Sequence, residues 1–266
     1  MNGLWLYCII ENRGEMKWNC LGIHGTSAVF VVPGGEFAAV VSEEPMKKYP
    51  LVRDYLIAHQ KVNETVMQGR SVLPVRFCTM TERKEKIVDE VLVPKAQEFR
   101  KEFAEIEGKE EYGLRVRWTN LDRIFREIGE TDEKILEKKK KILLQTEAER
   151  RIELVDIGHW VQTAIQQKNQ AMVDALMAEL VPLATRSKKN NTLGDAMILN
   201  AAFLLKKGVE PALSAKVLSL DEKYKGLLQF KYVGPVPPFN FVEIVIKWRE
   251  EPSHATVQGE KNVSVG

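Results

Sequence analysis

The chain has 266 residues, and its 39 basic residues nearly balance 37 acidic ones. A hydrophobic content of 44% with 29% charged residues is typical of a globular protein of one or two domains. The net charge of +2 gives no electrostatic reason to expect nucleic acid or an anionic membrane as a partner, and the sequence lacks the apolar run of about 18 residues that would predict a membrane-spanning helix.

The first part of the chain alternates predicted strands and helices. Its apolar and β-branched runs predict strands over 4–10, 28–32, 37–41 and 72–77, with a tight turn at Pro33 joining the second and third into a hairpin. Helical spacing predicts helices over 54–67, ended by Gly69, and over about 82–106, interrupted at Pro94. Residues 112–118 alternate as a half-solvated strand does. This order predicts an α+β domain over 1–118, with helices on one face of a mainly antiparallel sheet.

The middle of the chain, residues 119–190, predicts a helical hairpin of coiled-coil character. Four apolar residues lie seven apart: Leu121, Ile128, Ile135 and Ile142. Thr131 is the expected N-cap of a long helix, and an apolar stripe from Val161 to Leu180 continues the pattern. The polar stretch 166–170 is the expected turn. The stripe favours self-packing over a membrane or partner contact, and the lysines at 138–141 favour a solvated face.

Residues 191–249 predict a second, smaller α+β unit. An apolar run covers 196–205, Pro211 opens a helix to about Tyr224, and 227–233 alternates as a strand. The phrase Gly234-Pro235-Val236-Pro237-Pro238-Phe239-Asn240-Phe241 follows, and its prolines exclude helix interior and central strand. We expect a rigid corner that serves packing or binding. Residues 241–248 fit a strand or a helix, and 250–266 are expected to form a flexible tail.

No pattern predicts catalysis, a metal or a cofactor. The three cysteines and four histidines are too scattered for a zinc site, so we expect reduced thiols in a cytoplasmic protein. The glycines after Pro33 lie between strands and lack the Lys-Ser/Thr of a phosphate loop. His59 and Cys78 could form a nucleophile pair, but without an orienting acid a histidine bonded within a helix–sheet interface is favoured. Arg76 in an apolar strand predicts a buried salt bridge, with Glu64 or Glu110 as partner, and recognition of an anion or partner as the second interpretation.

These residues together resemble a known family. The opening Leu6-Tyr7-Cys8, Ala38-Ala39-Val40-Val41-Ser42, Ala58-His59-Gln60, Val72-Leu73-Pro74-Val75-Arg76-Phe77, Glu111-Tyr112-Gly113-Leu114-Arg115-Val116 and the Gly-Pro-x-Pro-Pro corner stand in the order found in the gas vesicle protein F/L family. In that family the corner commonly reads Gly-Pro-Trp-Pro-Pro-Tyr-Ser-Phe, so Val236, Phe239 and Asn240 depart from it, and Cys78 stands where glycine usually follows Arg-Phe.

The resemblance implies ferredoxin-like α+β domains with coiled-coil helices, and a role in gas vesicle assembly. The implied partners are the small, apolar gas vesicle shell protein and other accessory gas vesicle proteins. An apolar subunit would aggregate in water unless a partner covered it, so apolar and aromatic anchors are expected at the contact. The alternative function is a small-molecule-binding protein or enzyme, which predicts a closed polar pocket around His59, Arg76 and Cys78.

The motifs supply the candidate residues for partner binding or for the fold itself, and none of them is expected to be catalytic. These candidates are His59, Gln60, Pro74, Arg76, Phe77, Gly234, Pro235, Pro237, Pro238, Phe239 and Phe241.

Overall fold

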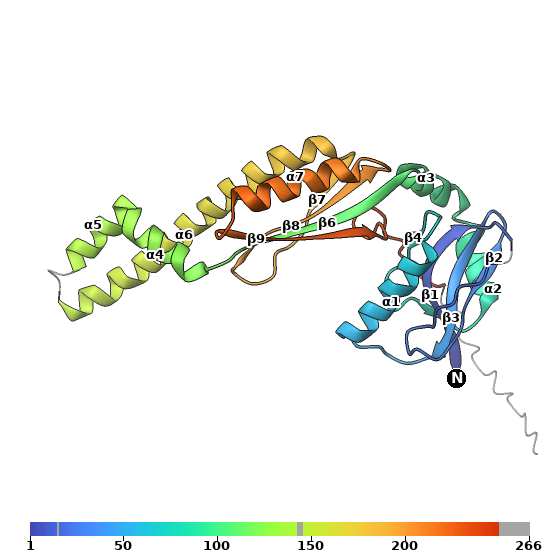
Figure 1. Ribbon diagram of the computed structural model, residues 1–266. Coiled ribbons are helices and arrows are strands. Elements are labelled where there is room, and N and C mark those ends of the chain that lie inside the picture. The colour runs from blue at the N-terminus through green and yellow to red at the C-terminus, as the bar shows by residue number, and fades with distance from the viewer. Residues whose placement is uncertain (15, 143–145, 250–266) are drawn as a thin grey trace, which may run out of the picture.

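Two antiparallel sheets form the framework of the protein in a computed structural model that describes residues 1–14, 16–142 and 146–249 (Figure 1). The first sheet has the order β2-β3-β1-β4, with β5 also paired to β1. Its strands are β1 (Asn2–Glu11), β2 (Val29–Gly34), β3 (Phe37–Pro45), β4 (Leu73–Pro74) and β5 (Met80–Thr81). The second sheet has the order β7-β8-β6-β9. Its strands are β6 (Lys109–Trp118), β7 (Arg186–Lys189), β8 (Met197–Lys206) and β9 (Leu228–Val236).

The first sheet is covered on both faces, whereas the sequence pattern predicts helices on one face only. One face packs Trp5 and Tyr7 of β1 against Val62 of α1 (Arg53–Val66). The other packs Leu6 against Ile87 and Phe99 of the helices that follow β5. The physical reason lies in β1, whose residues 3–10 are all buried, because a strand at the centre of a two-sided core is apolar throughout rather than alternating.

The helix predicted over 82–106 is divided. It consists of α2 (Lys84–Ile87), a π-helical turn (Val88–Leu92) and α3 (Ala96–Ile106), with the break at Pro94 as expected. The strand predicted over 72–77 is also shorter than the pattern indicates, since only Leu73 and Pro74 pair with β1 as β4. Beyond β4, Val75 is buried by packing with Val242 and Ile244 of the C-terminal segment.

The second sheet carries helices α6 (Glu147–Leu180) and α7 (Glu210–Lys223) on one face (Figure 1). Leu114 and Val116 of β6 pack on that side with Leu176 of α6 and Leu213 of α7. The sequence pattern places residues 112–118, which belong to β6, in the first α+β unit. The structure instead pairs it with β8 and β9 in the centre of the second sheet, because its register with both strands buries its alternate apolar residues under these helices.

Three helices extend beyond one end of the second sheet: α4 (Leu121–Thr131), α5 (Glu133–Ile142) and the first half of α6 (Figure 1). Ile128 and Ile135 are buried in one core with Ile165 of α6. Two expectations are wrong here. Thr131 ends α4 rather than capping a long helix, since Asp132 accepts the backbone N–H groups of residues 134 and 135. The stretch 166–170 lies within continuous α6, because polar residues on an exposed helix face need no turn.

The C-terminal segment, residues 237–249, returns to the first sheet. Ile244 forms a parallel bridge with Val75, and Ile244 N–H donates to Pro74 O at 3.2 Å. Val242 and Ile244 are buried in the core beside Leu73. The segment is neither the strand nor the helix considered for 241–248, since its only strand-like contact is this single bridge within the described residues. The tail predicted over 250–266 lies outside the described residues.

Candidate functional site

Three distant sequence motifs meet in one groove on the first sheet. We call it the His59 groove, and its volume is about 380 Å³. It lies where α1, the residues after β4 and the C-terminal segment come together. Its lining comprises Leu56, His59, Gln60, Pro74, Val75, Arg76, Phe77, Phe239, Val242 and Glu243. Six of the predicted residues therefore share one site: His59, Gln60, Pro74, Arg76, Phe77 and Phe239.

His59 lies against the first sheet on the inner face of α1, where it is 4% exposed. Its Nδ1 accepts a hydrogen bond from the Trp5 indole N–H at 3.0 Å. Burial lowers the pKa of His59 to about 4. The ring is therefore neutral near pH 7. Because Nδ1 is the acceptor, Nε2 carries the proton, and Nε2 has no hydrogen-bond partner among the described residues.

The walls around His59 are aromatic and aliphatic. The Phe77 ring centroid lies 5.7 Å from that of His59, and the Phe239 centroid lies 6.5 Å from it. Phe239 is 37% exposed, so part of its ring faces the solvent. The groove can therefore receive an apolar side chain.

The buried salt bridge predicted for Arg76 is wrong. Its side chain is exposed, and its nearest carboxylate is Glu243, at 3.8 Å, rather than Glu64 or Glu110. The reason is that β4 ends at Pro74, so Arg76 lies beyond the strand and turns outward to the rim of the groove. An exposed guanidinium needs no buried partner.

Cys78 is exposed and has a φ of 65°. No hydrogen bond joins it to His59 in the described part of the chain, and the ring nitrogen that could act as a base is either bonded to Trp5 or protonated. The closed polar pocket that the enzyme alternative predicts around His59, Arg76 and Cys78 is not formed, since the Arg76 and Cys78 side chains both face the solvent.

Part of the proline corner is buried and part of it is exposed. Pro237 and Pro238 are buried, and Pro238 O accepts the N–H groups of Phe241 at 3.1 Å and Val242 at 2.9 Å, which turns the chain toward the first sheet. The Phe241 ring lies under the Arg186 guanidinium, 5.4 Å from its centroid. These three residues thus hold the C-terminal segment in place.

Gly234 and Pro235 line a second groove, which we call the inter-sheet groove, of about 700 Å³. One wall is the C-terminal half of α1, with Gln60 and Glu64, and the turn after it, with Gln68. The other is the second sheet, with Arg115 of β6 and Lys231 of β9. Gln60 lines both grooves, so the two sites meet at α1.

A polar contact that was not predicted from the sequence fixes the C-terminal segment. Glu111 of β6 is 1% exposed and accepts two hydrogen bonds from Asn240, at 3.0 Å from its backbone N and at 2.5 Å from Nδ2. Asn240 Oδ1 in turn accepts from Asn190 Nδ2 at 2.9 Å. The departure of Asn240 from the serine of the family phrase was the available signal, because a hydroxyl could not reproduce this set of bonds.

A group of exposed apolar side chains was also missed. Four of them lie within residues 51–57, at and just before the start of α1, and Leu56 is shared with the His59 groove. We call them the α1 apolar surface: Leu51, Val52, Leu56 and Ile57. Leu51 is 77% exposed and Ile57 50%. The helical pattern could have revealed them, because Ile57 and Leu56 are adjacent and cannot both face the sheet.

The described residues hold no group of three or more histidine, cysteine or acidic side chains placed to bind a metal ion. Among the helices described, none combines the length and the apolar character needed to cross a membrane.

Comparison with known proteins gives one consistent result. Residues 3–243 match the family model of the gas vesicle synthesis protein GvpL/GvpF. Gas vesicle protein F of a Nostoc species is 26% identical over 245 residues, which cover 91% of this chain and 99% of the relative. Gas vesicle protein L1 of Halobacterium salinarum is 24% identical, with 90% of each chain covered.

Solved structures agree. The crystal structure of the gas vesicle protein GvpF from an Anabaena species superposes with a TM-score of 0.80 at 25% identity, covering 92% of this chain and 99% of that one. GvpF from Microcystis aeruginosa has the same fold, with a TM-score of 0.72 and coverage of 90% and 98%. The resemblance noted in the sequence is thus confirmed, and the chain belongs to the GvpL/GvpF family of gas vesicle proteins.

Proposed function

We propose that this protein is a non-catalytic accessory protein of gas vesicle assembly that binds the small, apolar gas vesicle shell protein. It acts in the cytoplasm, at the vesicle, together with other accessory gas vesicle proteins. Membership of the GvpL/GvpF family supports the gas vesicle role. The α1 apolar surface, continuous with the His59 groove through Leu56, supports the binding role.

Four exposed apolar side chains lie within residues 51–57, at and just before the start of α1, where a single exposed leucine would need no explanation but a cluster does. The aromatic groove beside them offers a recess for an anchor residue, and Arg76 with Glu243 gives it a polar rim. Burying such a surface against an apolar subunit would keep that subunit from aggregating.

We also propose the finer domain organisation. An N-terminal unit, a helical hairpin with coiled-coil packing and a C-terminal ferredoxin-like unit make up the chain. The element sequence β6, helices, β7, β8, α7, β9 and the strand order β7-β8-β6-β9 support the ferredoxin-like assignment. The buried isoleucines of α4, α5 and α6 support the packed hairpin.

The test is co-purification of the shell protein with the full-length protein when both are produced together. Fragments divided at residue 118 would separate β6 from β8 and β9, so point variants are preferable. Leu51→Glu/Ile57→Glu alters two exposed residues of the α1 apolar surface and should abolish retention of the shell protein. Leu193→Glu/Leu218→Glu is the matched control, since both leucines are exposed in the C-terminal half, at 73% and 66%.

The control variant should retain the shell protein as the wild type does. The proposal fails if the folded wild type retains none, or if the α1 variant retains as much as the control.

A further inference from the structure

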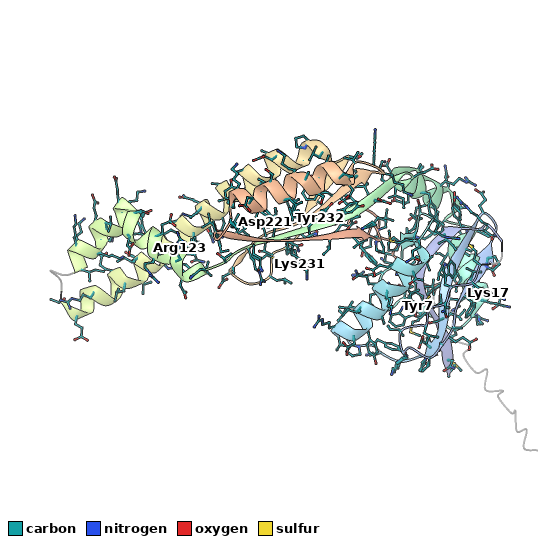
Figure 2. All side chains as sticks on the ribbon, in the orientation of Figure 1. Tyr7, Lys17, Arg123, Asp221, Lys231 and Tyr232 are labelled. Atoms are coloured by element: carbon teal, nitrogen blue, oxygen red, sulfur yellow. The ribbon has the colours of Figure 1, made fainter. Side chains whose placement is uncertain are left out.

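The second sheet has one face without helices. Helices α6 and α7 cover the side on which Leu114, Val116 and Tyr232 lie (Figure 1). Strand side chains alternate between faces, so Arg115, Arg117 and Lys231 lie on the other side. Figure 2 shows Lys231 on the side of β9 away from α7, opposite to its neighbour Tyr232.

The exposed charged side chains at the centre of this helix-free face are all positive. Arg115 stands directly opposite Lys231 in the β6–β9 register, and Arg117 follows two residues along. All three side chains are exposed. Like charges directly opposite each other on paired strands destabilise a sheet. Among the described residues, no carboxylate forms an ion pair with any of the three.

The other charged groups of this face are already engaged. Arg186 lies 3.9 Å from Glu105, and Lys188 Nζ donates to Asn240 O at 3.2 Å. Glu111, the carboxyl group on this face, is buried and bonded to Asn240. The chain as a whole carries a net charge of only +2, so the concentration of free cations at Arg115, Arg117 and Lys231 is local.

Two of these cationic side chains lie in a groove that can hold an extended polypeptide chain. Arg115 and Lys231 line the inter-sheet groove of about 700 Å³. Strand β9 pairs with β6 on one side only, so its other edge is open in the described structure. An open strand edge beside a groove is the arrangement by which a sheet accepts an additional strand from a partner, with alternate side chains reading the sheet face.

We propose that the helix-free face of the second sheet binds an extended, acidic segment of a partner polypeptide. The segment lies in the inter-sheet groove along β9, with carboxylates on Arg115 and Lys231 in the groove and on Arg117 beyond it. Glu64 and Glu110 line the same groove, and their carboxylates would repel a uniformly charged polyphosphate. A polypeptide fits better, because it carries neutral amides between its carboxylates. This surface is distinct from the α1 apolar surface, so the inference goes beyond the shell-protein contact.

Fluorescence anisotropy with a labelled peptide of alternating glutamate and threonine tests the proposal on the full-length protein at low ionic strength. The wild type should bind this peptide, and Arg115→Gln/Lys231→Gln should weaken binding by roughly tenfold or more, since each exposed ion pair contributes up to about a factor of five. The matched control Arg126→Gln/Lys140→Gln removes the same charge from exposed residues of α4 and α5 and should bind as the wild type does.

Three outcomes would overturn the proposal: no binding of the acidic peptide by the wild type, equal weakening in the control, or tighter binding of an oligothymidylate of equal charge than of the peptide. Arg115 and Lys231 are exposed, so the double variant should fold, and its thermal unfolding temperature should not fall below that of the wild type. If it does not fold, the single variant Lys231→Gln on the edge strand gives the same test with a smaller effect. Loss of shell-protein binding would leave these outcomes unchanged, because that contact uses other residues.

Discussion

The contact between Glu111 and Asn240 makes stability depend on pH in a defined direction. Burial raises the pKa of Glu111 from 4.5 to about 7, with the two hydrogen bonds from Asn240 and the charge of Lys188 offsetting part of the effect. Between these two pH values the unfolded chain has lost the proton while the folded protein still holds it. The free energy of unfolding therefore falls as pH rises through this window, and the loss of stability is complete above about pH 7.

The magnitude follows from the shift. A pKa raised from 4.5 to about 7 corresponds to about 3 kcal/mol of unfolding free energy, at about 1.4 kcal/mol per pKa unit. Glu111→Gln removes the titration while it keeps an oxygen to accept from the Asn240 backbone N–H. The difference in unfolding free energy between variant and wild type should therefore change by about 3 kcal/mol in favour of the variant from acid to neutral pH.

Urea unfolding of both proteins at a series of pH values measures this difference. Glu137→Gln replaces an exposed carboxylate of α5 and should follow the wild-type profile throughout. Parallel profiles for the wild type and Glu111→Gln would show that Glu111 ionises normally in the folded protein. The account of the buried carboxyl group would then be refuted.

Three further predictions concern stability, each measured by urea or thermal unfolding. Lys231→Glu places a carboxylate opposite Arg115 and should stabilise the protein by about 0.5 kcal/mol, which is an increase of roughly 1–2 °C in the unfolding temperature. A decrease would contradict the like-charge argument. Gly234→Ala should cost about 2–3 kcal/mol, because its Cβ would lie 2.3 Å from Tyr112 Cδ1 at a φ of +152°. Gly158→Ala is the control on the exposed side of α6, where the added Cβ meets no atom within 4 Å. It should raise the free energy of unfolding by about 0.5–1 kcal/mol. Equal effects of the two substitutions would contradict the predicted steric clash at Gly234. His59→Ala should cost about 3 kcal/mol, since it leaves a cavity and deprives the buried Trp5 N–H of its acceptor, and an unchanged unfolding midpoint would mean that this bond contributes nothing.

Local patterns predicted most elements, and their failures have identifiable causes. The helices at α1 and α7, the hairpin of β2 and β3 and the break at Pro94 all depend on turn residues and short-range spacing, which the sequence displays directly. The buried salt bridge predicted for Arg76 was wrong because a strand pattern does not show where the strand ends. Strand β4 ends at Pro74, so the Arg76 guanidinium faces the solvent.

The candidate residues were found by motif, while their arrangement was not. His59 and Phe239 are 180 positions apart in the sequence, and no local rule indicates that their rings lie 6.5 Å from each other. The C-terminal segment brings them together by pairing Ile244 with Val75 and by bonding Asn240 to Glu111. These are contacts between residues whose individual patterns predict only an apolar run and a polar turn.

The sequence by itself determined the family, the α+β composition, the proline corner and six of the residues that line the His59 groove, because motifs of nearby residues in the chain carry each of these. Only the tertiary structure decided that β6 belongs to the second sheet, that both faces of the first sheet are covered, and that three cations share a helix-free face. The physical reason is that strand pairing and burial depend on partners far along the chain, and an alternating strand such as β6 fits either sheet until one set of helices covers its apolar face.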